Sequence, residues 1–192
     1  MKDLKDMSLE ELWQLFPIIL KEHNPQYKDW YNKEKAQLLL ALGSYNIYRV
    51  SHIGSTAVAG LIAKPTIDIL LELSCGYNVK AVARQCQKNG WLLMAENIAG
   101  QMLDFNKGYT PDGFAERVYH LHIKPLGDWG ELYFRDYLQQ NVAVAQAYAA
   151  LKLNLLNKYQ NNRNAYTEAK TDFITQYTRK AKDEYKGRYI PL

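Results

Sequence analysis

The sequence has few cysteines, no long hydrophobic run and no internal repeat, and each absence excludes a class of protein. Cys75 and Cys86 are its two cysteines, and their spacing indicates neither a metal-type pair nor a disulfide framework. No apolar run approaches the roughly 20 residues of a membrane span. The N-terminal residues carry charges of both signs and lack the apolar core of a signal peptide. We therefore expect a cytoplasmic protein with no membrane partner.

Charge is also modest, with a charged share of 23%, a net charge of +4 and an apolar share of 47%, as in ordinary soluble globular proteins. Basic residues gather between positions 158 and 188, interspersed with acidic ones. Such a segment can bind nucleic acid. The favoured interpretation is a solvated helix face whose opposite charges pair, so RNA binding is the least favoured function and a nucleic-acid partner is not expected.

Hydrophobic periodicity predicts an α/β (α+β) protein with one mixed sheet covered by helices and a helical C-terminal part. Strands are predicted over 45–53, 66–73, 91–95, 101–106 and 117–124, the last two flanking a 108–113 loop, and helices near 8–16, 26–42 and 79–90 and from 131 onward. A chain of 192 residues most simply forms a single domain, 1–192. We divide it into N-terminal helices (1–44), a sheet core holding the site (45–125) and C-terminal helices (126–192).

Residues 51–72, SHIGSTAVAGLIAKPTIDILLE, carry the strongest functional signal. A strand runs into the Gly54-Ser55 turn, where backbone N–H groups can bind phosphate. Asp68 follows in an apolar strand, and a carboxylate there needs a metal ion, a cation or hydrogen-bond donors. Lys64 either binds a phosphate or neutralises Asp68. Glu72 lies about 13 Å farther along the strand, and we expect it at the strand's solvated end.

His120 and His122 point to one face of a predicted strand, with Cα atoms about 6.6 Å apart. Two imidazoles so placed can share a metal ion, with Asp68 completing a two-histidine, one-carboxylate set. Alternatively, one is a general base and the other binds phosphate. A third interpretation is a pair of hydrogen-bonded histidines on a half-exposed strand. Further candidates for phosphate binding are Lys107, Arg117 and Arg135.

Four segments resemble the GrpB family of bacterial proteins: HIGSTAVAGLIAKPTIDI, RVYHLHI, ELYFRDYL, and Tyr166 with Lys170 in AYTEAKTDFI. The resemblance implies a nucleotidyltransferase-like fold, in which a Gly-Ser turn presents a triphosphate and strand carboxylates bind two Mg²⁺ ions. Gly54 and Ser55 match the turn, and Asp68 matches the first acid of an Asp-x-Asp pattern. Leu70 occupies the position of the second acid, which departs from that pattern.

These observations favour a metal-dependent nucleotidyltransferase or phosphotransferase that uses Mg²⁺ or Mn²⁺, a nucleoside triphosphate and a small-molecule acceptor. The predicted catalytic and metal-binding residues are Asp68, His120 and His122. The predicted nucleotide- and phosphate-binding residues are Gly54, Ser55, Lys64, Arg117 and Arg135. Leu70 favours the alternative, a nucleotide or phospho-ligand binding protein that performs no transfer. The sequence does not specify the acceptor or the oligomeric state.

Overall fold

Five strands form one mixed sheet in the computed structural model, which describes residues 2–43, 45–160 and 162–191. The sheet order is β1-β2-β5-β4-β3. The strands are β1 (Ile47–Ile53), β2 (Thr66–Leu73), β3 (Leu92–Asn97), β4 (Met102–Thr110) and β5 (Gly113–Pro125). β2 and β5 are parallel, and the other neighbouring pairs are antiparallel. The parallel pair places two chain segments about 50 residues apart side by side at the centre of the sheet.

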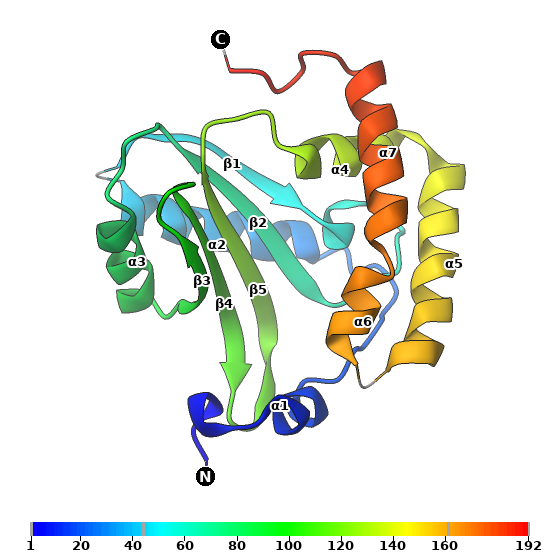
Figure 1. The fold of residues 1–192 in the computed structure, drawn as a ribbon, viewed down its shortest axis with the longest axis horizontal. Helices are drawn as coiled ribbons and strands as arrows, with labels where there is room; N and C mark the ends of the chain where they lie inside the picture. The colour runs from blue at the N-terminus through cyan, green and yellow to red at the C-terminus, as the bar shows by residue number, and fades with distance from the viewer. Residues whose placement is uncertain (1, 44, 161, 192) are drawn as a thin grey trace.

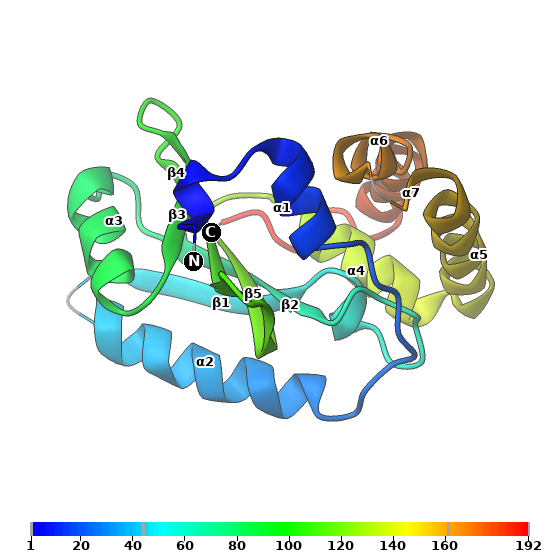
Figure 2. The same cartoon turned by 90° about the horizontal axis from the view of Figure 1, so that it is seen from below.

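Helices cover the sheet from both sides (Figures 1 and 2). They are α1 (Leu9–Leu15), α2 (Tyr27–Leu42), α3 (Val79–Lys88), α4 (Gly130–Gln140), α5 (Val142–Tyr159), α6 (Arg163–Glu168) and α7 (Thr171–Glu184), with short 3₁₀ turns at Leu4–Asp6 and Ser55–Ala57. α2 runs along one side of the sheet, whereas α1 and α6 lie on the other (Figure 2). Helices α4 to α7 gather beside β1 and β2, away from β3 (Figure 1). No helix in the described ranges is both long and apolar enough to cross a membrane.

Strand β2 divides the core because its side chains alternate between two faces. Ile67, Ile69 and Leu71 pack with α2 and α3 in the main core. Asp68 and Leu70 point to the opposite face, where Leu70 packs against Ile53 of β1 and Leu132 of α4. The strand is therefore covered on both of its faces. Its second face also carries the polar groups of the candidate site.

The prediction that Glu72 lies at the solvated end of its strand is wrong, because its side chain is fully buried. Arg49 lies opposite it on β1, and its guanidinium donates to the Glu72 carboxylate, with Nη2 and Oε1 2.8 Å apart. The Gly127 N–H donates to the same oxygen over 3.2 Å. A paired and hydrogen-bonded carboxylate is tolerated inside a protein. Glu72 is therefore a structural residue.

The β4–β5 hairpin also differs from its prediction, since both strands continue through most of the expected 108–113 loop. Gly108 has a φ of +87°, and a Cβ there would lie 2.2 Å from the Arg117 carbonyl oxygen. The pairing register shifts at this point, between Lys107 and Tyr109. Glycine here marks a bulge inside the ladder rather than the start of a turn. The lengthened hairpin brings Tyr109 to the site.

Candidate functional site

The Gly54 turn packs directly on the Asp68 carboxylate. In the β1–β2 ladder Ile53 is opposite Asp68, so Gly54, the next residue, lies against the Asp68 side chain. Gly54 has a φ of +71°, and a Cβ there would lie 2.2 Å from Asp68 Oδ2. No other residue fits, because both the backbone angle and the space require the absence of a Cβ. The sequence-predicted turn and acid are thus neighbours.

A cavity of about 270 Å³ opens beside this turn, and we call it the basic cavity. The predicted residues Gly54, Ser55, Lys64, Asp68 and His120 all line it. The C-terminal helices supply the facing wall, which includes Tyr148, Lys152, Arg163, Tyr166 and Lys170. The cavity therefore forms where the sheet meets helices α5 and α6.

The basic cavity holds one carboxylate, Asp68, among four basic side chains, those of Lys64, Lys152, Arg163 and Lys170. Lys152 is buried, and its ammonium donates to Ser55 Oγ over 3.1 Å and to the Ile62 carbonyl oxygen. Burial and the charge of Lys170 lower the pKa of Lys152 to about 7. Burial and the charges of Arg163 and Lys170 likewise lower the pKa of Lys64 to about 7. Crowded cations of this kind favour the binding of an anion.

Tyr166 adds an unsatisfied polar group to this wall. Two ammonium groups lie over its ring, with Lys64 Nζ 5.4 Å and Lys170 Nζ 4.5 Å from the ring centroid. The side chain is fully buried, and its hydroxyl has no hydrogen-bond partner among the described residues. A buried hydroxyl without a partner costs free energy.

A hydrogen-bonded chain runs from Asp68 across the sheet to α6. Asp68 Oδ1 lies 3.0 Å from His120 Nδ1, His120 Nε2 lies 2.8 Å from the Tyr109 hydroxyl, and Arg163 donates to that hydroxyl over 2.9 Å. An ionised Asp68 only accepts, so His120 Nδ1–H donates to it, and in the neutral imidazole Nε2 then accepts from the Tyr109 hydroxyl. Burial opposes ionisation of Asp68, but the His120 bond and the nearby His122 and Lys64 charges outweigh it and lower the pKa of Asp68.

His122 lies on the same face of β5 but has a different partner. In the ladder His120 is level with Asp68, and His122 is level with Leu70. His122 Nδ1 lies 2.6 Å from Asp104 Oδ1 on β4. Burial alone would lower the pKa of His122, but Asp104 and Asp68 raise it. In the described part of the chain, no group of three His, Cys, Asp or Glu side chains is placed to hold a metal ion.

Three predicted phosphate-binding residues lie elsewhere. Arg117 and Lys107 point to the α2 side of the sheet, where Arg117 stacks on Trp30 and Lys107 pairs with Glu34 over 2.7 Å. Arg117 is three residues from His120, and an odd spacing on a strand places side chains on opposite faces. Arg135 lines a separate surface hollow and bonds to Asp136 and to the His52 carbonyl oxygen. The structure does not bring Arg117 or Arg135 to the basic cavity.

Lys64 was predicted as a phosphate-binding residue, whereas the other three cations of the cavity, Lys152, Arg163 and Lys170, were not. Lys152 is a single basic residue in the apolar stretch AYAALKLNLL. Its isolation there is the sequence feature that could have identified it as a site residue. Arg163 and Lys170 belong to the basic segment interpreted as a solvated helix face. That interpretation holds for exposed members such as Arg179 and Lys180 but is wrong for these two, which line the cavity.

Comparisons with known proteins agree on fold and family. The profile of the GrpB protein family matches residues 17–180. The UPF0157 protein YqkA of Bacillus subtilis is 32% identical over 189 residues, which cover 94% of this chain and 52% of that protein. The glutamate-rich protein GrpB of Alkalihalophilus pseudofirmus is 30% identical over 162 residues, 83% of this chain and 92% of that one. The chain thus spans about half the length of the Bacillus subtilis relative.

Two solved structures extend the comparison. The crystal structure of the conserved protein GrpB from Enterococcus faecalis has a TM-score of 0.74 and 28% identity, covering 87% of this chain and 99% of that one. A crystal structure of the Cid1 poly(U) polymerase with Mg and 3′-dATP bound has a TM-score of 0.50 and 11% identity, covering 84% of this chain and 51% of that one. The second likeness concerns the fold alone and confirms the expected nucleotidyltransferase-like architecture.

Proposed function

The chain belongs to the GrpB family, and from this premise and the geometry of the basic cavity we propose that it binds the phosphate groups of a nucleoside triphosphate. The observation that carries the proposal is the ring of Lys64, Lys152, Arg163 and Lys170 facing the Gly54-Ser55 turn. Cationic side chains and a glycine turn recognise phosphate oxygens through charge-assisted hydrogen bonds. A fold shared with a nucleotide-bound polymerase supports the same ligand class.

The donor set does not fit a resident pair of divalent ions. Two-metal phosphoryl transfer requires several carboxylates, and Asp68 is the one carboxylate among the described residues that line the cavity. Leu70 fills the position of a second acid and packs in an apolar cluster. The dependence on Mg²⁺ or Mn²⁺ stays a prediction, and we expect the ion to enter the cavity bound to the triphosphate.

Binding is tested by titrating ATP, GTP, CTP and UTP, each with Mg²⁺, with Mn²⁺ or with EDTA, by calorimetry and thermal shift. We expect at least one triphosphate to raise the melting temperature, with an affinity that falls as salt rises, because the contacts are ionic. Tripolyphosphate should also bind, since the cavity recognises phosphate. The proposal is wrong if none of these five compounds binds.

Binding should weaken as the pH rises above 7. Lys64 and Lys152 have pKa values near 7 in the free protein, so both lose their charge between pH 7 and 9, whereas the phosphates of the ligand lose none of their negative charge over that range. Phosphate binding then requires proton uptake, and we expect the affinity to fall by about tenfold between pH 7.5 and 9. Calorimetry in buffers of different ionisation enthalpy measures that uptake. A flat affinity over this range would show that neither lysine contacts the ligand.

A second candidate is a transfer reaction at the same site, which the chain of Asp68, His120 and Tyr109 supports. If an acceptor hydroxyl replaced Tyr109 at His120 Nε2, the imidazole would accept its proton while that oxygen bonded to phosphorus and pyrophosphate or a nucleoside diphosphate left. Asp68 would hold the tautomer that leaves Nε2 free to accept. In this case His120→Gln should abolish product release yet preserve nucleotide affinity. If the wild-type protein releases no product from any triphosphate in the presence of small-molecule hydroxyl acceptors, the transfer reaction is wrong. The binding function then stands without it.

A further inference from the structure

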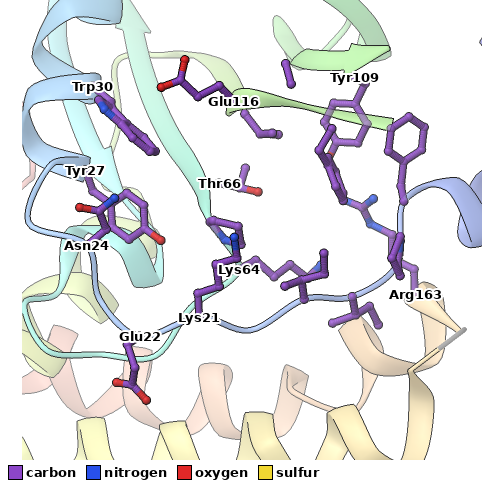
Figure 3. A pocket seen from close by; sticks show the side chains of 18 residues that line it. Lys21, Glu22, Asn24, Tyr27, Trp30, Lys64, Thr66, Tyr109, Glu116 and Arg163 are labelled. Atoms are coloured by element: carbon purple, nitrogen blue, oxygen red, sulfur yellow. The ribbon is translucent and has the colours of Figure 1, made fainter. Parts of the chain in front are cut away.

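A second cavity, of about 440 Å³, adjoins the basic cavity, and we call it the aromatic cavity. Five aromatic side chains line it: Phe16, Tyr27, Trp30, Tyr109 and Phe114. Figure 3 shows Trp30, Tyr27 and Asn24 along one side and Tyr109 and Arg163 along the other, with Thr66 and Lys64 between them. Its walls come from residues 16–24, the start of α2 and the β4–β5 hairpin. This volume lies in the range of small-molecule sites, about 300–1,000 Å³.

The two cavities share part of their walls. Lys64, Thr66 and Arg163 line both. Tyr109 stands at the same boundary, because its ring lines the aromatic cavity while its hydroxyl bonds to His120 in the basic cavity. Lys64 and Arg163 are therefore placed to contact a molecule that occupies either cavity.

The chemistry of the aromatic cavity suits a flat, weakly polar group rather than a phosphate. Phe16, Tyr109 and Phe114 form a cluster with ring centroids 4.9 to 5.3 Å apart. Phe114 leaves 37% of its surface exposed, and Ile19, also on the wall, leaves 38%. Apolar surface left open inside a cavity is typical of a ligand site. Asn24 and Glu116 also line the cavity and carry hydrogen-bonding groups for the polar edge of such a ligand.

We propose that the aromatic cavity binds the base of the same nucleotide whose phosphates occupy the basic cavity. The inference rests on the proposed function and adds to it that the ligand must carry a planar aromatic group. Aromatic rings stack on bases of every kind. The ligand class is therefore a nucleoside polyphosphate, as opposed to a sugar phosphate or inorganic polyphosphate, and the bridging residues Lys64 and Arg163 lie near its sugar–phosphate junction.

The test compares ATP, GTP, CTP and UTP with inorganic tripolyphosphate, which supplies the phosphates without a base. We expect the preferred nucleotide to bind at least tenfold more tightly than tripolyphosphate. Phe114→Ala removes part of the wall and should weaken the binding of that nucleotide by about tenfold, the effect of losing a stacking contact. The affinity for tripolyphosphate should not change. Ala115→Trp, which places a large side chain at the same wall, should have the same selective effect.

Met94→Ala is the matched control, because Met94 is an exposed apolar residue on β3 that lines none of the described cavities. It should change neither affinity. The inference is overturned if tripolyphosphate and every nucleotide bind equally, or if both cavity variants weaken tripolyphosphate as much as the nucleotide; phosphate binding would then stand without a base site. If neither tripolyphosphate nor any nucleotide binds, the proposed function fails first and the base site fails with it.

Discussion

Replacing Lys152 with Met is expected to weaken triphosphate binding by about 10- to 100-fold, the effect of losing a charged hydrogen bond to the ligand. Lys152 is buried and holds Ser55 Oγ, so its ammonium lies at the predicted phosphate turn. Met keeps the apolar stem and removes the charge. Titration of wild type and variant with tripolyphosphate measures the loss directly.

The same change should leave the fold at least as stable as the wild type, with a pH dependence of known sign. The pKa of Lys152 is about 7 in the folded protein and about 10.4 in an unfolded chain. Between these values the unfolded chain binds more protons, so the wild type gains stability as the pH rises. The Met variant lacks this gain. Its advantage in melting temperature should therefore be largest below pH 7 and shrink toward pH 9.

Lys158→Met is the matched control, since Lys158 is an exposed residue on the same helix, stacked on Tyr159. It should alter neither binding nor the pH profile of stability. If Lys152→Met bound tripolyphosphate as well as the wild type does, Lys152 would be no phosphate ligand. If it unfolded the protein instead, the hydrogen bonds of Lys152 to Ser55 and Ile62 would be its main role.

Gly54→Ala should destabilise the protein by about 2 to 6 kcal/mol, the sum of two costs. The backbone angles of Gly54, φ +71° and ψ −172°, lie in a region that only glycine adopts freely, at a cost of about 1–3 kcal/mol for another residue. The new Cβ would also lie 2.2 Å from Asp68 Oδ2, and relief of such overpacking costs about 1–3 kcal/mol. Chemical denaturation measures the total.

Gly60→Ala separates the two costs. Gly60 also has a positive φ, +73°, but a Cβ there would meet nothing within 4 Å. We expect Gly60→Ala to lower the free energy of unfolding only by the cost of the backbone conformation, about 1–2 kcal/mol. Adding Asp68→Ala to Gly54→Ala should recover part of the stability, because the clashing carboxylate is gone. Equal losses at Gly54 and Gly60, with no recovery in the double variant, would show that the close approach of Gly54 to Asp68 is unimportant.

The sheet half of the site was predictable because it is local in sequence. Gly54, Ser55, Lys64 and Asp68 lie within one strand–turn–strand segment, whose pattern of glycine, proline and apolar residues determines its own geometry. His120 was proposed from strand alternation, and the parallel pairing of β2 with β5 places it level with Asp68. Strand alternation places Arg117 and His120 on opposite faces of the sheet. It would therefore have excluded Arg117 from the predicted site.

The helical half was not predictable in the same way. Periodicity shows that a segment is helical and which side is apolar, but not which strand it will meet. Lys152 reaches Ser55 only because α5 packs beside the 3₁₀ turn, through Tyr148, Val58 and Leu61. Arg163 is the first residue of the short helix α6, and Lys170 is the N-cap residue of α7. Their roles depend on tertiary packing.

The bond between Ser55 and Lys152 joins residues 97 positions apart. A contact of this range closes a large loop and carries the entropy cost of that closure. During synthesis the glycine turn and its acid emerge long before the lysine that faces them. The cationic wall of the cavity is complete only once α5 has been synthesised and has packed beside the 3₁₀ turn, so phosphate binding should report that packing step.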